Sequence, residues 1–97
     1  MVDMSISAKF IGSLKNFFDK ENIIFDYETE ITVKELITSI LEKTPNIKDF
    51  LISVQNNEFR LNSLVLINDI EISALNGIDT KLSDGDKITF IPVIHGG

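Results

Sequence analysis

The sequence contains no cysteine and a single histidine, His95, among its 97 residues. Without cysteine, the chain has no disulfide, no thiolate nucleophile and no cysteine-ligated zinc. One histidine without any thiolate is a poor ligand set for a transition metal, so we expect no metal site and no intrinsic cofactor. The absence of cysteine fits a location inside the cell, and we expect the protein to be cytoplasmic.

Long apolar runs are also missing. No run approaches the roughly 20 apolar residues that span a bilayer, and the first residues show no signal-peptide pattern, so we expect no membrane partner. The chain has 9 lysines and arginines against 15 aspartates and glutamates, a net charge of −6. Because phosphate binding needs clustered Lys and Arg, we expect no direct nucleic-acid ligand. The acidity either keeps a small protein soluble or meets a basic partner, and both interpretations stay open.

Two further features argue against chemistry within the chain itself. It has no Gly-x-x-x-x-Gly-Lys phosphate loop, so we do not expect it to bind ATP. Asp84 and Asp86 flank Gly85. This short polar segment predicts a tight turn in preference to a metal or acid–base site.

Apolar residues make up 43% of the sequence, enough for the core of one small domain. We assign residues 1–93 to that domain and residues 94–97 to a flexible tail that ends in Gly-Gly. Residues 5–11 alternate apolar and polar side chains, which predicts a strand with one wet face. The pattern breaks at Gly12, and a second short strand is expected over residues 22–27. The connection between these strands contains three expected core anchors: Leu14, Phe17 and Phe18.

The clearest helix begins after Thr32, because Thr32 and Glu35 have the spacing of a capping box. Its expected apolar stripe consists of Val33, Leu36, Ile37, Ile40 and Leu41. Pro45 ends this helix. A shorter second helix, capped by Asn46, is expected from the spacing of Ile47, Phe50, Leu51 and Val54.

The last third of the chain is strand-like again. Residues 64–67 are apolar on both faces, Asn68 and Asp69 are suited to a turn, and residues 70–73 are expected to return as a strand. Turns at 76–77 and 83–86 precede a final strand over residues 87–93. Strands packed on one side by a helix form a two-layer α+β domain.

Residues 64–97, LVLINDIEISALNGIDTKLSDGDKITFIPVIHGG, resemble the C-terminal half of the MoaD/ThiS sulfur carriers and in particular the ubiquitin-related modifier branch. The resemblance implies a β-grasp, ubiquitin-like fold. In that fold a mixed sheet of four to five strands packs on one main helix plus a shorter helix, and the first and last strands are central parallel neighbours. The extra stretch at residues 46–62 fits the modifier branch and weakens the case for a dedicated pterin or thiazole carrier.

The resemblance also implies that the working group is the carboxylate of Gly97. A carboxylate is ionised at neutral pH and is a poor electrophile, so it must be activated before attack. In the family, a partner enzyme uses ATP to adenylate it. A sulfur donor then gives a thiocarboxylate for tRNA thiolation, or a lysine of a target protein gives an isopeptide bond. The chain is accordingly expected to be the substrate of an activating enzyme and not an enzyme.

The end of the chain suits this role sterically. Gly96 and Gly97 have no Cβ, so the tail can enter a narrow channel. Residues 93–97 would reach roughly 17 Å when extended. A catalytic base must be held in place, so we expect His95 to be a polar tail residue or a contact for the activating enzyme.

The final strand suggests a docking surface. Ile88 and Phe90 share the core-facing parity, which leaves Thr89, Ile91 and Val93 facing outward. An apolar outer face often marks an interaction site, although a loop or the 46–62 stretch could cover it. By register from Gly-Gly, Ile91 matches the exposed apolar position that the family uses against activating enzymes.

Two alternatives stay open at this stage. The chain is also consistent with the small sulfur-carrier subunit of molybdopterin synthase, which uses the same Gly-Gly chemistry. A plain interaction domain without loading chemistry is the second alternative.

Overall fold

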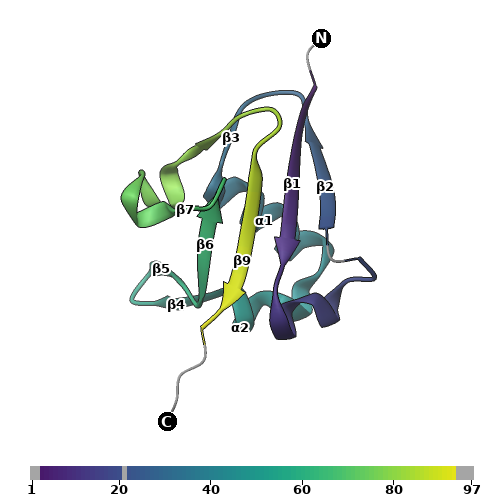
Figure 1. The fold of residues 1–97 in the computed structure, drawn as a ribbon. Helices are drawn as coiled ribbons and strands as arrows, with labels where there is room; N and C mark the ends of the chain where they lie inside the picture. The colour runs from purple at the N-terminus through teal and green to yellow at the C-terminus, as the bar shows by residue number, and fades with distance from the viewer. Residues whose placement is uncertain (1–2, 21, 94–97) are drawn as a thin grey trace.

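The computed structural model describes residues 3–20 and 22–93, which form a mixed sheet packed against one main helix (Figure 1). The strands are β1 (Met4–Phe10), β2 (Asn22–Tyr27), β3 (Ile31–Thr32), β4 (Ile52–Gln55), β5 (Glu58–Leu61), β6 (Ser63–Ile67), β7 (Ile70–Glu71), β8 (Lys81–Leu82) and β9 (Lys87–Pro92). The helices are α1 (Val33–Lys43) and α2 (Lys48–Leu51), with 3-10 turns η1 (Gly12–Phe17), η2 (Pro45–Ile47), η3 (Ile72–Ala74) and η4 (Gly77–Asp79).

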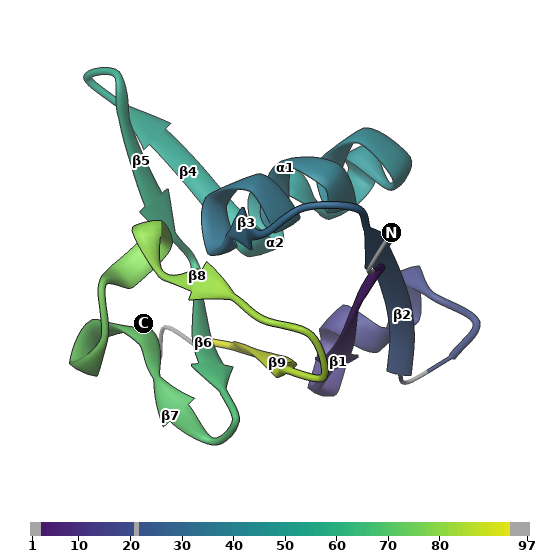
Figure 2. The same ribbon diagram turned by 90° about the horizontal axis from the view of Figure 1, so that it is seen from above.

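The main sheet has the strand order β2-β1-β9-β6-β7. Strands β1 and β9 pair in parallel, with Ala8 opposite Ile88, and the other neighbours are antiparallel. Helix α1 lies across one face of this sheet (Figure 2). The β-grasp arrangement, with the first and last strands as central parallel neighbours, is therefore confirmed.

Helix α1 begins where the capping box predicts. The Oγ1 atom of Thr32 accepts a hydrogen bond from the Glu35 N–H at 3.2 Å, and Glu35 Oε1 accepts one from the Thr32 N–H at 3.1 Å. This exchange satisfies two donors that the first turn would otherwise leave unpaired. The buried face of the helix consists of Val33, Leu36, Ile37 and Ile40.

The core lies between α1 and the sheet, and it contains stacked aromatic rings. The ring of Phe10 stacks on Phe18 at 4.2 Å and on Phe90 at 5.1 Å between centroids. Leu14 is fully buried, and Phe17 and Phe18 pack partly buried against the core. The three expected anchors are confirmed, and the segment that carries the first two is the 3-10 turn η1.

The structure corrects the prediction for residues 46–62. Asn46 caps no helix, because η2 starts after Thr44 and α2 starts after Ile47, in both cases without a side-chain cap. Helix α2 ends at Leu51, and Val54 belongs to strand β4. Ile52 and Val54 are β-branched and favour a strand, so the helical spacing of Val54 was coincidental.

Strands β4 and β5 instead form a separate hairpin that the sequence prediction missed. Its turn places Asn56 at φ 54° and Asn57 at φ 65°, and asparagine tolerates this left-handed region better than most residues. The hairpin projects from the body beside α1 (Figure 2).

Three smaller differences concern short elements. The strand expected over residues 70–73 ends at Glu71, because Ile72 begins η3. The two-residue pair β3–β8 was not predicted, since such short strands show no period. Strand β9 ends at Pro92, one residue before the predicted limit.

The segment 83–86 is a turn, as predicted. Asp84 Oδ1 accepts a hydrogen bond from the Ser5 N–H at 2.8 Å, and Asp86 Oδ1 accepts one from Asn68 Nδ2 at 3.0 Å. Gly85 has φ 86°, which a residue with a Cβ rarely adopts. The two carboxylates therefore fasten the start of β9 to β1 and to the β6–β7 turn. Among the described residues, no group of His, Cys, Asp and Glu is placed to hold a metal ion.

No helix among the described residues is long and apolar enough to cross a membrane.

Replacing the cap residue tests whether α1 depends on its capping box. Thr32→Ala should lower the free energy of unfolding by about 1 kcal/mol. The midpoint of thermal unfolding should fall by roughly 4–8 °C. The matched control is Thr38→Ala, because Thr38 is exposed and donates only to the carbonyl of Lys34 within the same helix. Equal destabilisation of the two variants would contradict the cap assignment.

Candidate functional site

Strand β9 carries the chain from the centre of the sheet to its C-terminal segment. Ile88 and Phe90 are fully buried, as the sequence predicts. Phe90 lies opposite Phe10 of β1 on one side and Val65 of β6 on the other. The strand is paired on both edges, so the root of the C-terminal segment is rigidly fixed in the core.

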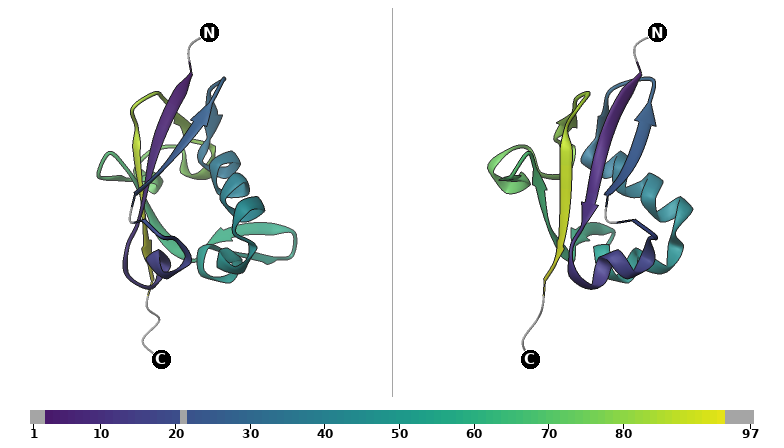
Figure 3. Two further views of the ribbon diagram at one scale, coloured as in Figure 1. Left: turned by 90° about the vertical axis from the view of Figure 1, so that its right-hand side faces the viewer. Right: turned by 45° about the vertical axis from the view of Figure 1, so that its right-hand side comes forward.

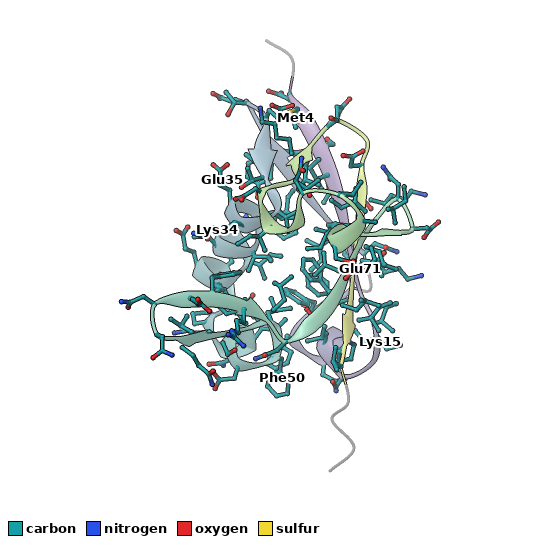
Figure 4. All side chains as sticks on the ribbon, turned by 90° about the vertical axis from the view of Figure 1, so that its left-hand side faces the viewer. Met4, Lys15, Lys34, Glu35, Phe50 and Glu71 are labelled. Carbon is teal, nitrogen blue, oxygen red and sulfur yellow. The ribbon has the colours of Figure 1, made fainter. Side chains whose placement is uncertain are left out.

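The chain leaves the sheet at the C-terminal end of β9, and this end of the molecule also contains η1 and α2 (Figure 1). The rings of Phe17 and Phe50 join these elements, with 5.1 Å between centroids. Figure 4 shows Lys15 of η1 and Phe50 of α2 at this same end. Val93 follows β9 and is 48% exposed. His95, Gly96 and Gly97 lie outside the described residues, so the expectations for them remain predictions.

The left-hand view of Figure 3 shows α1 on one face of the sheet, and we call the opposite face the open face. Ile91 belongs to the open face, because its neighbour Phe90 on β9 is buried toward α1. Ile91 is half-buried and pairs with Leu64, which is 39% exposed. Leu66 pairs with Thr89 next to them. A shallow hollow on this face is lined by Ser7, Lys9, Ile11, Asn22, Leu66, Asn68, Asp69, Lys87, Thr89 and Ile91.

The 46–62 stretch does not cover the open face. The β4–β5 hairpin lies on the helix side, where Lys34 Nζ of α1 is 5.8 Å from the centre of the Phe59 ring. Figure 4 places Lys34 beside this hairpin, and the left-hand view of Figure 3 shows the hairpin on the side of α1. The alternative that this insert hides the apolar outer residues of β9 is therefore wrong.

The hollow differs in charge from the whole chain. Lys9 and Lys87 both line the hollow, and Asp69 lies among its lining residues as well. The hollow itself is therefore not acidic, whereas the chain as a whole has a net charge of −6.

The sequence predictions missed Leu64 and Leu66 as surface residues, although a signal was present. Residues 64–67 are apolar at every position, so one parity must face away from the core. The structure buries Val65 and Ile67 and turns Leu64 and Leu66 to the open face. Together with Ile91, which pairs with Leu64, they form an apolar area on the sheet two residues before exposed Val93.

Residues 5–97 match the family Urm1 (Ubiquitin related modifier). The chain is similar to Ubiquitin-related modifier 1 of Saccharomyces cerevisiae, with 32% identity over 97% of this chain and 99% of the yeast protein. The fold is similar to the solution structure of small archaeal modifier protein 1 (SAMP1) from Methanosarcina acetivorans, with a TM-score of 0.80 and 22% identity over 100% of both chains.

A further similarity is to a chain in the protein–protein complex of subunits 1 and 2 of the molybdopterin-converting factor from Helicobacter pylori 26695. Its TM-score is 0.60, with 26% identity over 97% of this chain and 100% of that chain. The family match includes the open face and the segment after Val93. The chain belongs to the ubiquitin-related modifier family, Urm1.

Proposed function

We propose that this protein is a modifier and sulfur carrier whose Gly97 carboxylate is activated by adenylation. The loaded form is a thiocarboxylate for tRNA thiolation or an intermediate in conjugation to target lysines. The observation that carries this proposal is the course of β9. It leads from the centre of the core to an exposed Val93, four residues before the terminal Gly97.

The chemistry follows from the poor reactivity of a carboxylate. One carboxylate oxygen attacks the α-phosphorus of ATP, pyrophosphate leaves, and an acyl-adenylate forms. Hydrosulfide supplied by the sulfur donor then attacks the carbonyl carbon and expels AMP, and loss of the thiol proton leaves a thiocarboxylate. A lysine amine that attacks the same carbon and expels AMP gives an isopeptide bond instead. The ATP site belongs to the activating enzyme, because this sequence contains no phosphate-binding loop.

The role of this chain is to dock and to present its end. Ile91 of the open face pairs with Leu64 and lies two residues before exposed Val93. A partner that buries this apolar area also receives the segment that follows it. We propose that Ile91, Val93 and His95 contact the activating enzyme. The sulfur donor, the tRNA-thiolation enzyme and the proteins modified at lysines are then later partners.

A second candidate is the small sulfur-carrier subunit of molybdopterin synthase. Its support is the 26% identity to a chain of the Helicobacter pylori molybdopterin-converting factor complex. Purification from the native cells separates the two candidates. A stable complex with a large synthase subunit favours the second, and ladders of covalent conjugates favour the first.

Loading of the terminal carboxylate is tested by intact-mass measurement after incubation with ATP, a sulfur donor and the adenylating enzyme of the same organism. The mass of the wild-type chain should rise by the difference between one sulfur and one oxygen atom. Deletion of Gly97 should abolish the gain, whereas Thr38→Ala, an exposed change on α1, should load like the wild type. Loading of the Gly97-deleted chain would contradict the proposal, and no loading of any variant would favour a plain interaction domain.

Docking through the open face is tested by Ile91→Asp. A charge in the apolar contact should raise KM for the activating enzyme by about tenfold, the equivalent of about 1.4 kcal/mol. The fold should persist, because Ile91 is only half-buried and faces away from the core.

The matched control for that experiment is Val54→Asp. Val54 is 57% exposed and lies on β4, in the hairpin on the helix side of the sheet. It should leave KM unchanged. A normal KM for Ile91→Asp, or the same rise in both variants, would show that the open face next to the tail is not the docking surface.

A further inference from the structure

Gly12 touches the last residue of β9. Gly12 has φ +60°, and a Cβ on it would lie 3.2 Å from Cγ and 3.7 Å from Cδ of Pro92. The first distance is shorter than carbon atoms normally approach, so the proline ring would have to move by a few tenths of an ångström. A side chain at Gly12 would thus press on the ring of Pro92.

The η1 side of this contact is anchored and cannot easily yield. The Ile11 N–H donates to the Phe90 carbonyl at 3.0 Å, which extends the pairing of β1 with β9 up to the glycine. Leu14, two residues after Gly12, is fully buried in the core. An added side chain at Gly12 would therefore displace Pro92 more readily than η1.

The other side of Pro92 is also occupied. Pro92 pairs with Ser63 of β6, at the end of the β6–β9 ladder, and Ser63 is only 5% exposed. The pyrrolidine ring itself fixes φ of this residue. Pro92 is therefore held between η1 and β6, at the last position before the chain leaves the sheet.

We infer that the Gly12–Pro92 contact sets the direction of the chain where it leaves the sheet at Val93, and that Gly12 is a positioning residue for activation of the Gly97 carboxylate. This inference rests on the proposed function. Residues 93–97 would reach roughly 17 Å when an activating enzyme holds them extended, so a rotation of about 10° at Val93 would then shift the carboxylate by about 3 Å. Misplacement of a reacting group by 1 Å can lower the rate about 100-fold. Because residues 93–97 can adjust in part, we expect a loss of about tenfold in the rate of activation.

The chain contains a control that separates steric contact from backbone strain. Gly77 has φ +59°, nearly the value at Gly12, but a Cβ there would meet no atom within 4 Å. Gly12→Ala and Gly77→Ala therefore force alanine into the same unfavourable backbone region. Only the first of them presses on Pro92.

The experiment measures ATP–pyrophosphate exchange by the adenylating enzyme of the same organism as a function of carrier concentration. Gly12→Ala should lower kcat about tenfold and leave KM within about twofold, because the docked chain presents its carboxylate wrongly. Gly77→Ala should keep the wild-type kcat. Simple loss of folded protein would instead raise the apparent KM at unchanged kcat, since only the folded fraction is substrate.

Pro92→Ala keeps the inference testable if Gly12→Ala fails to fold. This variant removes the ring, leaves Gly12 intact and should lower kcat to a similar extent. The double variant Gly12→Ala/Pro92→Ala should lower kcat by no more than the more damaged of the two single variants, because both changes act through one contact.

Three results would overturn the inference. They are an unchanged kcat for Gly12→Ala, equal kcat losses for Gly12→Ala and Gly77→Ala, and additive losses in the double variant. If the wild-type chain supports no exchange, the proposed function fails and this inference fails with it. If the wild type supports exchange and one of the three results appears, only the positioning role is lost.

Discussion

The parallel pairing of β1 with β9 at the centre of the sheet determines most of the other features of this protein. Parallel neighbours cannot be joined by a tight turn, so the residues between these strands must cross over, and α1 packs on the sheet as part of that crossover. Both flanks of β9 are paired, and Phe90 stacks on Phe10 with 5.1 Å between ring centroids. As a result, the chain can leave the core only at the C-terminal end of β9.

One face of β9 stabilises the fold, and the opposite face is available for recognition. Ile88 and Phe90 are fully buried under α1, whereas Thr89 and Ile91 line the open face. Strand β6 repeats the division, with Val65 and Ile67 inside and Leu64 and Leu66 outside. Substitutions of one parity therefore affect folding, and those of the other parity can change docking without unfolding the protein.

Local patterns in the sequence predicted the elements that have a clear period or a cap. Alternation identified β1, and the Thr32–Glu35 pair located the start of α1. The parallel centre of the sheet came from the family resemblance, because periodicity does not specify which strands are neighbours. The helix expected through Val54 was wrong because a helical spacing occurred by chance in a segment whose β-branched residues favour a strand. The contact between Gly12 and Pro92 joins residues near opposite ends of the chain, so no local pattern reveals it.

The central claim, that the terminal carboxylate is the working group, is tested most directly on protein isolated from its own cells. C-terminal peptides should be analysed by mass spectrometry without prior reduction or alkylation. We expect a fraction in which Gly97 ends in a thiocarboxylate or is joined to the side-chain amine of a lysine. Recovery of Gly97 solely as a free carboxylate, from cells actively thiolating tRNA and under conjugating conditions, would contradict it.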